Sequence, residues 1–173
     1  MQDIIQTIAE YFNNPYWIIL SAIITIITIL LFIISLLKSN IFIVLYRFAR
    51  GLYSRDIAIF ADNNNFNSLK ELLTDSKIFK ENNIHQIDKK SIDKAGNYTI
   101  FLVHYLSFED KIDNILSIKK DSAALIIYAP QEEGKIKHDI LQKINEKRNS
   151  IIVNFGGRLL NDILISMITT SYN

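Results

Sequence analysis

An uncharged run of 21 residues, from Trp17 to Leu37, constrains this chain more than any other feature. At about 1.5 Å rise per residue, a helix of this length matches the roughly 30 Å hydrocarbon core of a bilayer. A signal peptide would begin with a basic segment, have a shorter apolar core and end at a small-residue cleavage site. Here the charges before the run are the acids Asp3 and Glu10. The sequence therefore predicts a transmembrane helix over residues 16–38.

Basic residues lie on only one side of this run. Lys38, Arg47, Arg50 and Arg55 follow it, and no Lys or Arg precedes it. The positive-inside rule then places the C-terminal part of the chain in the cytoplasm and the N-terminus outside. We expect a single-pass protein of the cell's inner (plasma) membrane.

Two flanking segments are expected to lie along the bilayer surface. In residues 1–15 apolar side chains recur at helical spacing, which predicts a short external helix. The members of this apolar set are Ile4, Ile5, Ile8 and Phe12. Residues 39–55 contain too short an apolar stretch for a second crossing, so we expect an interfacial helix and linker whose arginines meet anionic headgroups.

Hydroxyl residues of the uncharged run fall on one helix face. They are Ser21, Thr25, Thr28 and Ser35, separated by steps of four, three and seven. Small hydroxyl residues on one face allow two helices to approach closely and to form hydrogen bonds across the contact. The alternative is that each hydroxyl bonds only to a carbonyl of its own helix. We favour the first interpretation, which predicts a homo-oligomer, either a dimer or a tetramer.

Beyond residue 55 short runs rich in β-branched and aromatic residues alternate with amphipathic runs. This pattern predicts strands separated by helices. The predicted strands are 56–62, 84–87, 98–106, 123–129 and 150–155. The predicted helices begin near Ser68 and near Glu109, and two more cover 135–147 and 158–172.

The alternation indicates an α/β domain over residues 56–173. Right-handed crossovers give a mostly parallel sheet, and nearly continuous apolar strands are typical of a sheet covered on both faces. We therefore expect a three-layer, Rossmann-like or flavodoxin-like domain with a mostly parallel five-stranded sheet, whose strand order the pattern leaves open. The last helix is apolar on more than one face, which predicts packing on the sheet and on a partner subunit.

The charge balance limits the partners of this domain. Residues 38–173 carry 19 basic and 16 acidic residues, a net charge of +3. Such a nearly neutral domain lacks the basic character of proteins that bind duplex nucleic acid. The chain contains no cysteine, which excludes disulfides and thiolate metal sites and fits a reducing cytosol.

Ligands of such sheets bind outside the carboxyl ends of the strands. The polar loops expected at this edge are ADNNNFNS, LSFED, APQEEG and GGR, after the first, third, fourth and fifth strands. The candidate ligand-binding residues in these loops are Asn63, Asn64, Asn65, Ser68, Ala129, Gly156, Gly157 and Arg158.

Each of the two main loops has two interpretations. The amides of Asn63–Asn65 suit a base, a ribose or a phosphate, but Asn also forms turns and caps helices. In Gly156–Arg158 the glycines allow close backbone approach, the following helix N-terminus favours an anion and the arginine adds donors. A glycine pair before a helix is also a common tight turn. We expect the two loops to shape one shared site.

Several familiar sites are missing from the sequence. The first strand is not followed by GxGxxG, and GK[ST] is absent, so ordinary NAD or ATP binding is not expected and we predict no cofactor. The histidines His85, His104 and His138 have no metal-ligand spacing, and His104 alternates with apolar residues as a core or edge histidine does. Glu132 and Glu133 could act in acid–base chemistry, but solvated charges are the better interpretation. We therefore predict neither a metal site nor catalytic residues.

The layout resembles that of small membrane-anchored prokaryotic antiviral effectors. The resemblance is closest to CRISPR-associated membrane proteins with a CARF domain, and it covers the span 17–37, the alternating α/β domain and the polar loops after its first and fifth strands. This resemblance implies a Rossmann-like dimer that binds a nucleotide second messenger such as a cyclic oligoadenylate. It also implies that ligand binding or oligomerisation rearranges the membrane helices and perturbs the membrane.

Two other functions fit the same sequence. The first is a membrane-tethered enzyme that processes nucleotides or NAD, with Glu132 or Glu133 in its chemistry. The second is a recruitment or scaffold protein that senses no ligand.

Overall fold

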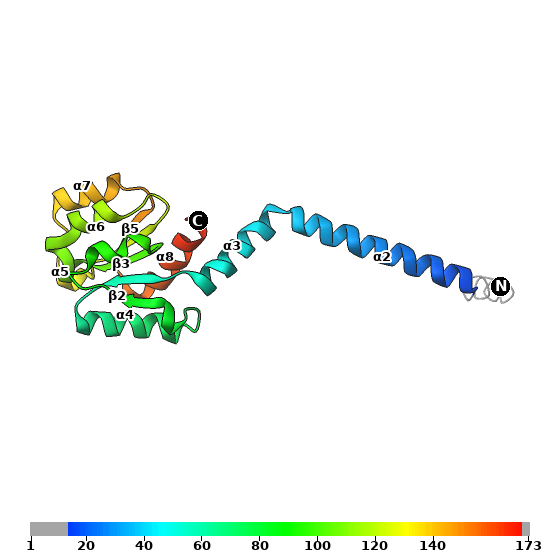
Figure 1. The fold of residues 1–173 in the computed structure, drawn as a ribbon, viewed down its shortest axis with the longest axis horizontal. Helices are drawn as coiled ribbons and strands as arrows, with labels where there is room; N and C mark the ends of the chain where they lie inside the picture. The colour runs from blue at the N-terminus through cyan, green and yellow to red at the C-terminus, as the bar shows by residue number, and fades with distance from the viewer. Residues whose placement is uncertain (1–13, 171–173) are drawn as a thin grey trace. The chain divides into compact units, whose positions relative to one another are not determined.

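The computed structural model describes residues 14–170, apart from the side chains of residues 47 and 50–54. The chain divides into two compact units, Met1–Leu45 and Tyr46–Asn173. Figure 1 shows the helices and strands of each unit. The short external helix expected in residues 1–15 lies almost entirely outside the described residues.

Helix α2 (Pro15–Lys38) is the main element of the first unit. It begins with Pro15 after the Asn14 cap, whose side-chain oxygen accepts a hydrogen bond of 3.0 Å from the Tyr16 N–H. An 18-residue window within it has a mean hydropathy of 3.0. The expected apolar N-terminal helix is thus present, and by length and composition it can cross a membrane.

The hydroxyl groups of α2 bond mostly within the helix. Ser21, Thr25 and Thr28 donate hydrogen bonds of 2.8–2.9 Å to the carbonyl oxygens of Ile18, Ser21 and Ile24. These bonds match the alternative of bonding within one helix. The hydroxyl oxygens keep accepting capacity toward a second helix. The oligomeric contact, which would also include Ser35, therefore stays a prediction.

Helix α3 (Asn40–Ser54) leads into the second unit, which is built around a five-stranded sheet. All strand pairs are parallel, and the strand order is β2-β1-β3-β4-β5. The strands are β1 (Ile57–Phe60), β2 (Ile84–Gln86), β3 (Ile100–His104), β4 (Ala124–Tyr128) and β5 (Ser150–Val153). The predicted α/β class and five-stranded sheet are confirmed, and the strand order is that of flavodoxin-like folds.

Helices cover both faces of this sheet. α4 and α8 bury one face, and α5, α6 and α7 bury the other, as Figure 1 shows for α4, α5, α6 and α7. The bounds are α4 (Asn63–Asp75), α5 (Tyr105–Phe108), α6 (Ile112–Ile118), α7 (His138–Glu146) and α8 (Gly156–Thr169). Short 3-10 turns are η1 (Glu81–Asn83), η2 (Ile92–Asn97), η3 (Glu109–Lys111) and η4 (Gln131–Glu133). Strand residues alternate between the two cores, so Phe101 packs on one face and Leu102 on the other.

Two helices begin earlier than the sequence predicts. Helix α4 begins at Asn63 instead of near Ser68, because the Asp62 carboxylate caps it by accepting the Asn65 N–H at 2.9 Å. Helix α8 begins at Gly156 instead of residue 158. Its two glycines adopt helical conformation, and Gly134 is the one glycine with positive φ within residues 14–170. The Asn63–Asn65 and Gly156–Arg158 segments are therefore first helical turns, not loops.

Arg55 is buried, although its position after the uncharged run suggested a membrane-facing cation. Its side chain is 2% exposed. Its two terminal nitrogens donate hydrogen bonds of 2.7 Å to the hydroxyl and to the carbonyl oxygen of Thr170. The residue before β1 is thereby tied to the end of α8. Arg55 cannot contribute to a basic surface at the bilayer.

We predict that Arg55→Met lowers the free energy of unfolding by about 2–3 kcal/mol, because charged hydrogen bonds to buried acceptors are lost. Arg55→Lys should lose less, since it keeps the charge and one bond. Urea unfolding of the full chain in detergent micelles, followed by circular dichroism, measures both changes. Arg158→Met is the matched control: its side chain is 71% exposed, so a change within about 0.5 kcal/mol is expected. Equal effects of the Arg55→Met and Arg158→Met substitutions would contradict the prediction.

Candidate functional site at the carboxyl edge of the sheet

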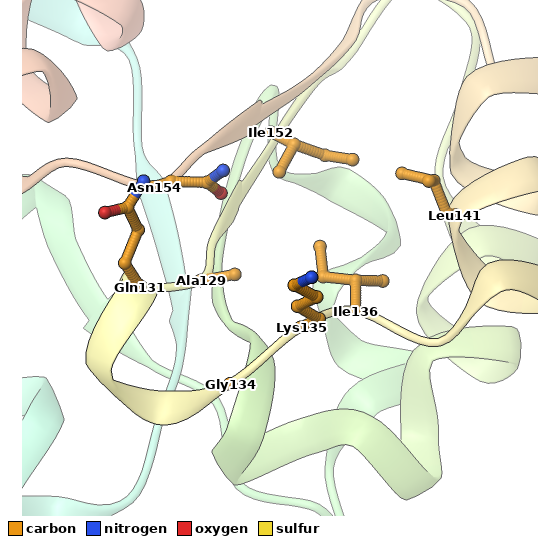
Figure 2. A pocket seen from close by; sticks show the side chains of 8 residues that line it. All are labelled: Ala129, Gln131, Gly134, Lys135, Ile136, Leu141, Ile152 and Asn154. Atoms are coloured by element: carbon orange, nitrogen blue, oxygen red, sulfur yellow. The ribbon is translucent and has the colours of Figure 1, made fainter.

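A large hollow of the domain lies at the carboxyl ends of β4 and β5. It has a volume of about 580 Å³ and is shown in Figure 2. The lining residues are Ala129, Gln131, Gly134, Lys135, Ile136, Leu141, Ile152 and Asn154. We call this hollow the large cavity.

The large cavity combines aliphatic walls with a few polar groups. Figure 2 shows the amide side chains of Gln131 and Asn154 on one side and the side chains of Leu141 and Ile152 on the other. Lys135 supplies the cation of this lining. Such a lining suits a flat, mostly apolar ring with hydrogen-bonding edges and an anionic group.

A second hollow, the small cavity, lies on the other side of the loop that joins β4 to α7. Its volume is about 230 Å³. It is lined by Asn65, Ser68, Leu69, Leu72, His104, Tyr128, Pro130, Glu132, Glu133 and Leu159. The β4–α7 loop therefore forms a wall of both cavities: Ala129, Gln131 and Gly134 face the large one, whereas Pro130, Glu132 and Glu133 face the small one.

A chain of hydrogen bonds crosses the carboxyl edge beside the small cavity. The Ser107 hydroxyl donates to the Asp62 carboxylate at 2.7 Å, and its oxygen lies 2.9 Å from His104 Nδ1. His104 Nε2 lies 3.2 Å from a carboxylate oxygen of Glu133. The chain joins the segments that follow β1, β3 and β4, and His104 at its centre is 2% exposed.

Local hydrogen bonds and burial shift the pKa of two groups at this edge. The backbone N–H of Asn65 and then the hydroxyl of Ser107 hold the pKa of Asp62 below its ordinary value. Partial burial raises the pKa of the Tyr128 phenol, and the nearby Glu132 and Glu133 carboxylates raise it further. Asp62 therefore stays ionised at neutral pH and Tyr128 keeps its proton.

The structure distributes the sequence-predicted residues over this edge. Asn65 and Ser68 line the small cavity, and Ala129 lines the large cavity. Asn63 lines a third hollow of about 270 Å³ beside β1 and β2, and it accepts a hydrogen bond from Gln86. Asn64 lines none of the three hollows; its carbonyl accepts the Ser68 hydroxyl.

The predicted Gly156–Arg158 turn reaches this edge only through its first residue. A Cβ built on Gly156 would lie 3.2 Å from the Tyr128 hydroxyl oxygen, so glycine permits this close approach. Gly157 and Arg158 line none of the three hollows. A guanidinium nitrogen of Arg158 lies 3.8 Å from a carboxylate oxygen of Asp162. The starts of α4 and α8 do meet at the small cavity, through Asn65 and Leu159. Ligand binding by these residues stays a prediction.

Sequence reasoning missed the residues at the centre of the site. His104 was expected in the core or at an edge, and its burial confirms this, but its polar contacts were not predicted. Glu133 was expected to be a solvated charge. Instead the Glu133 side chain is 29% exposed and lies against His104. One sequence signal could have indicated His104: it is a polar residue at the last position of a central strand, and Ser107 follows three residues later.

No group of three or more His, Asp or Glu side chains suited to a metal ion occurs within residues 14–170. Comparison with family models, with curated proteins and with solved structures finds no significant match to this chain. A function for this chain is therefore inferred from the geometry of the carboxyl edge.

We predict that Asp62→Ala destabilises the domain by about 1 kcal/mol at neutral pH, because the cap of α4 is lost. Because the folded pKa of Asp62 is lowered, the wild-type advantage should disappear as the pH falls below 3.8, through the folded pKa. Urea unfolding at several pH values measures this difference. Asp75→Ala, at the opposite end of α4, is the control, and it should be neutral or stabilising since it removes a negative charge from a helix C-terminus. A pH-independent loss for Asp62→Ala would contradict the assignment.

Proposed function

We propose that this chain is a membrane-anchored sensor whose α/β domain binds a nucleotide-type ligand such as a cyclic oligonucleotide. The large cavity at the carboxyl edge carries the proposal. Its volume of about 580 Å³ lies in the range of small-molecule sites, and parallel α/β sheets bind ligands at this edge. Anchoring would come from α2, which by length and composition can cross a bilayer.

The lining of the large cavity supports a nucleotide over other small ligands. Aliphatic side chains such as Leu141 and Ile152 can enclose a flat base. The amides of Gln131 and Asn154 can both donate to and accept from the edge of a base. Lys135 can pair with a phosphate. These contacts match the faces and the edge of the base and the phosphate of a nucleotide.

The output that we propose is a change in the packing of the membrane helices. The domain would lie in the cytoplasm, and copies would associate through α2 and α8. In support, Ile165 and Ile168 on the outer side of α8 are 56% and 40% exposed. Ligand binding would then alter the association of the α2 helices and perturb the bilayer. The resemblance to antiviral effectors supports a role in antiviral defence.

One observation favours a second function, a membrane-tethered enzyme that processes nucleotides or NAD. His104 and Glu133 form a pair at the wall of a cavity, as an acid–base pair does. Chromatographic analysis of NAD, ATP and cyclic oligoadenylates incubated with the full chain tests this function. Conversion that is lost in Glu133→Ala would replace the sensor by an enzyme, and intact nucleotides would leave the sensor as the proposal.

We predict that Lys135→Ala weakens nucleotide binding about tenfold, because one charge-assisted contact to phosphate is lost. Isothermal titration of the full chain in detergent micelles with AMP, cyclic di-AMP and cyclic tri- and tetra-adenylate measures the affinity. Lys120→Ala is the matched control: Lys120 is exposed and lies before β4, at the opposite edge of the sheet. Absence of binding to every nucleotide in this panel, or equal effects of the two substitutions, would contradict the proposed site.

We further predict that a nucleotide which binds also changes dye release from liposomes that contain the full chain. Lys135→Ala should shift this response to higher nucleotide concentration by the same factor as the binding constant, because binding and response share one site. Binding without any nucleotide-dependent release would contradict the membrane output and leave only a binding protein.

A further inference from the structure

Glu133 occupies a position beside a buried histidine. His104 is 2% exposed, and its Nε2 atom faces the Glu133 carboxylate at 3.2 Å on the wall of the small cavity. Burial of a polar side chain is costly unless each of its polar atoms has a partner. For His104 the two partners are Ser107 and Glu133.

The hydrogen-bond directions assign a donor to Nδ1 of this histidine and leave Nε2 facing the Glu133 carboxylate. The Asp62 carboxylate is ionised and only accepts, so the Ser107 proton is directed to Asp62. The Ser107 oxygen then accepts from His104 Nδ1–H. A carboxylate only accepts hydrogen bonds, so the 3.2 Å contact between Glu133 and Nε2 is a hydrogen bond in the form of His104 that carries a proton on Nε2. The pair is therefore a buried donor held against an oxyanion that belongs to the protein itself.

The oxyanion is carried by the 3-10 turn η4, whose segment is bonded to the rest of the domain at its ends and exposed in its middle. At one end the Ala129 N–H bonds to the Val153 carbonyl at 2.9 Å. At the other end the backbone N–H of Lys137 donates to the Tyr105 hydroxyl oxygen at 3.3 Å, and the Lys137 ammonium group pairs with the Glu109 carboxylate at 3.0 Å. Between them the residues of 131–135 are exposed, and Gly134 has φ of 107°. Within the described part of the chain, Glu133 is the one side chain of this segment with a polar contact.

Displacement of the turn would leave two donors facing the small cavity. One is His104 Nε2–H. The other is the Tyr128 hydroxyl, which lines the same cavity and has no hydrogen-bond partner within residues 14–170. This hydroxyl lies next to Gly156 in the first turn of α8, where free backbone N–H groups favour negative charge. Glu132 is carried by the same turn η4, so its charge would leave together with that of Glu133.

We propose that His104 and Tyr128 form an oxyanion site that Glu133 occupies in the free protein, and that the phosphate group of a ligand displaces Glu133 from it. Because the β4–α7 loop lines both cavities, this displacement changes the large cavity as well. The inference rests on the proposed function for the nucleotide that carries the phosphate. The oxyanion site itself needs only a phosphate group.

Titration of the full chain in detergent micelles with inorganic phosphate and with AMP tests the site. Glu133→Gln should tighten phosphate binding at least about tenfold, because the internal competitor loses its charge. Glu71→Gln, at an exposed carboxylate of α4 that does not line the small cavity, is the matched control and should change binding less than about threefold. Equal gains for the two variants, or no gain for Glu133→Gln, would overturn the proposal.

Removal of the His104 or Tyr128 donor should weaken phosphate binding. In the Glu133→Gln background, His104→Gln should abolish the gain, whereas His85→Gln, at an exposed histidine on β2, should not. Circular dichroism establishes that each variant is folded. If His104→Gln does not fold, Tyr128→Phe in the same background replaces it, since it removes one hydroxyl and should lose at least about threefold. A gain that survives loss of both donors would overturn the proposal.

The two proposals fail in different ways. If AMP binds in a Lys135-dependent manner but Glu133→Gln does not tighten phosphate, the oxyanion site is wrong and the nucleotide sensor stands. If Glu133→Gln tightens phosphate while no nucleotide binds, the nucleotide sensor is wrong and the oxyanion site stands.

Discussion

Burial of both faces of a parallel sheet is the constraint on which the rest of the domain depends. Residues along β1, β3 and β4 are almost all shielded from solvent, on both sides of the sheet. Apolar side chains on two faces require helices on two faces, and parallel strands require each helix to return the chain to the same starting edge. The connections that follow the strands therefore collect at one edge. Polar chemistry can be placed there without opening the core.

The β4–α7 loop gives this edge its character. It separates two hollows of different chemistry, one walled by aliphatic side chains and the other containing a histidine between carboxylates. A single loop can separate them because some of its residues line one hollow and the others line the second. Its anchors are Val153 on β5 and Tyr105 directly after β3, the two strands that flank β4. The proposed sensor and the proposed oxyanion site thus both depend on the β4–α7 loop.

The sequence predicts the features of this protein that depend on local pattern. The uncharged run indicates α2, and alternating apolar segments indicate the five strands and the α/β class, because hydrophobic periodicity reflects burial residue by residue. The strand order and the starts of α4 and α8 are not local in this sense. Asp62 determines where α4 begins through a carboxylate that serves the Asn65 N–H and also Ser107, which is 45 residues away.

The same limit explains the site. Ala129, Asn65 and Ser68 could be chosen because they follow strands, and the carboxyl ends of parallel strands share an edge. The role of His104 depends on its contacts with Glu133 and Ser107, and none of these three residues belongs to a recognisable sequence motif. Arg55 lies 115 residues from Thr170, so neither residue indicates the other in the sequence.

The bond between Arg55 and Thr170 joins the beginning of the α/β domain to its end. Residue 173 follows Thr170 by three positions in the sequence, and Thr170 is held at the end of the domain where β1 begins. An affinity tag or fluorescent protein fused at the C-terminus would therefore crowd the entry of the chain into its first strand.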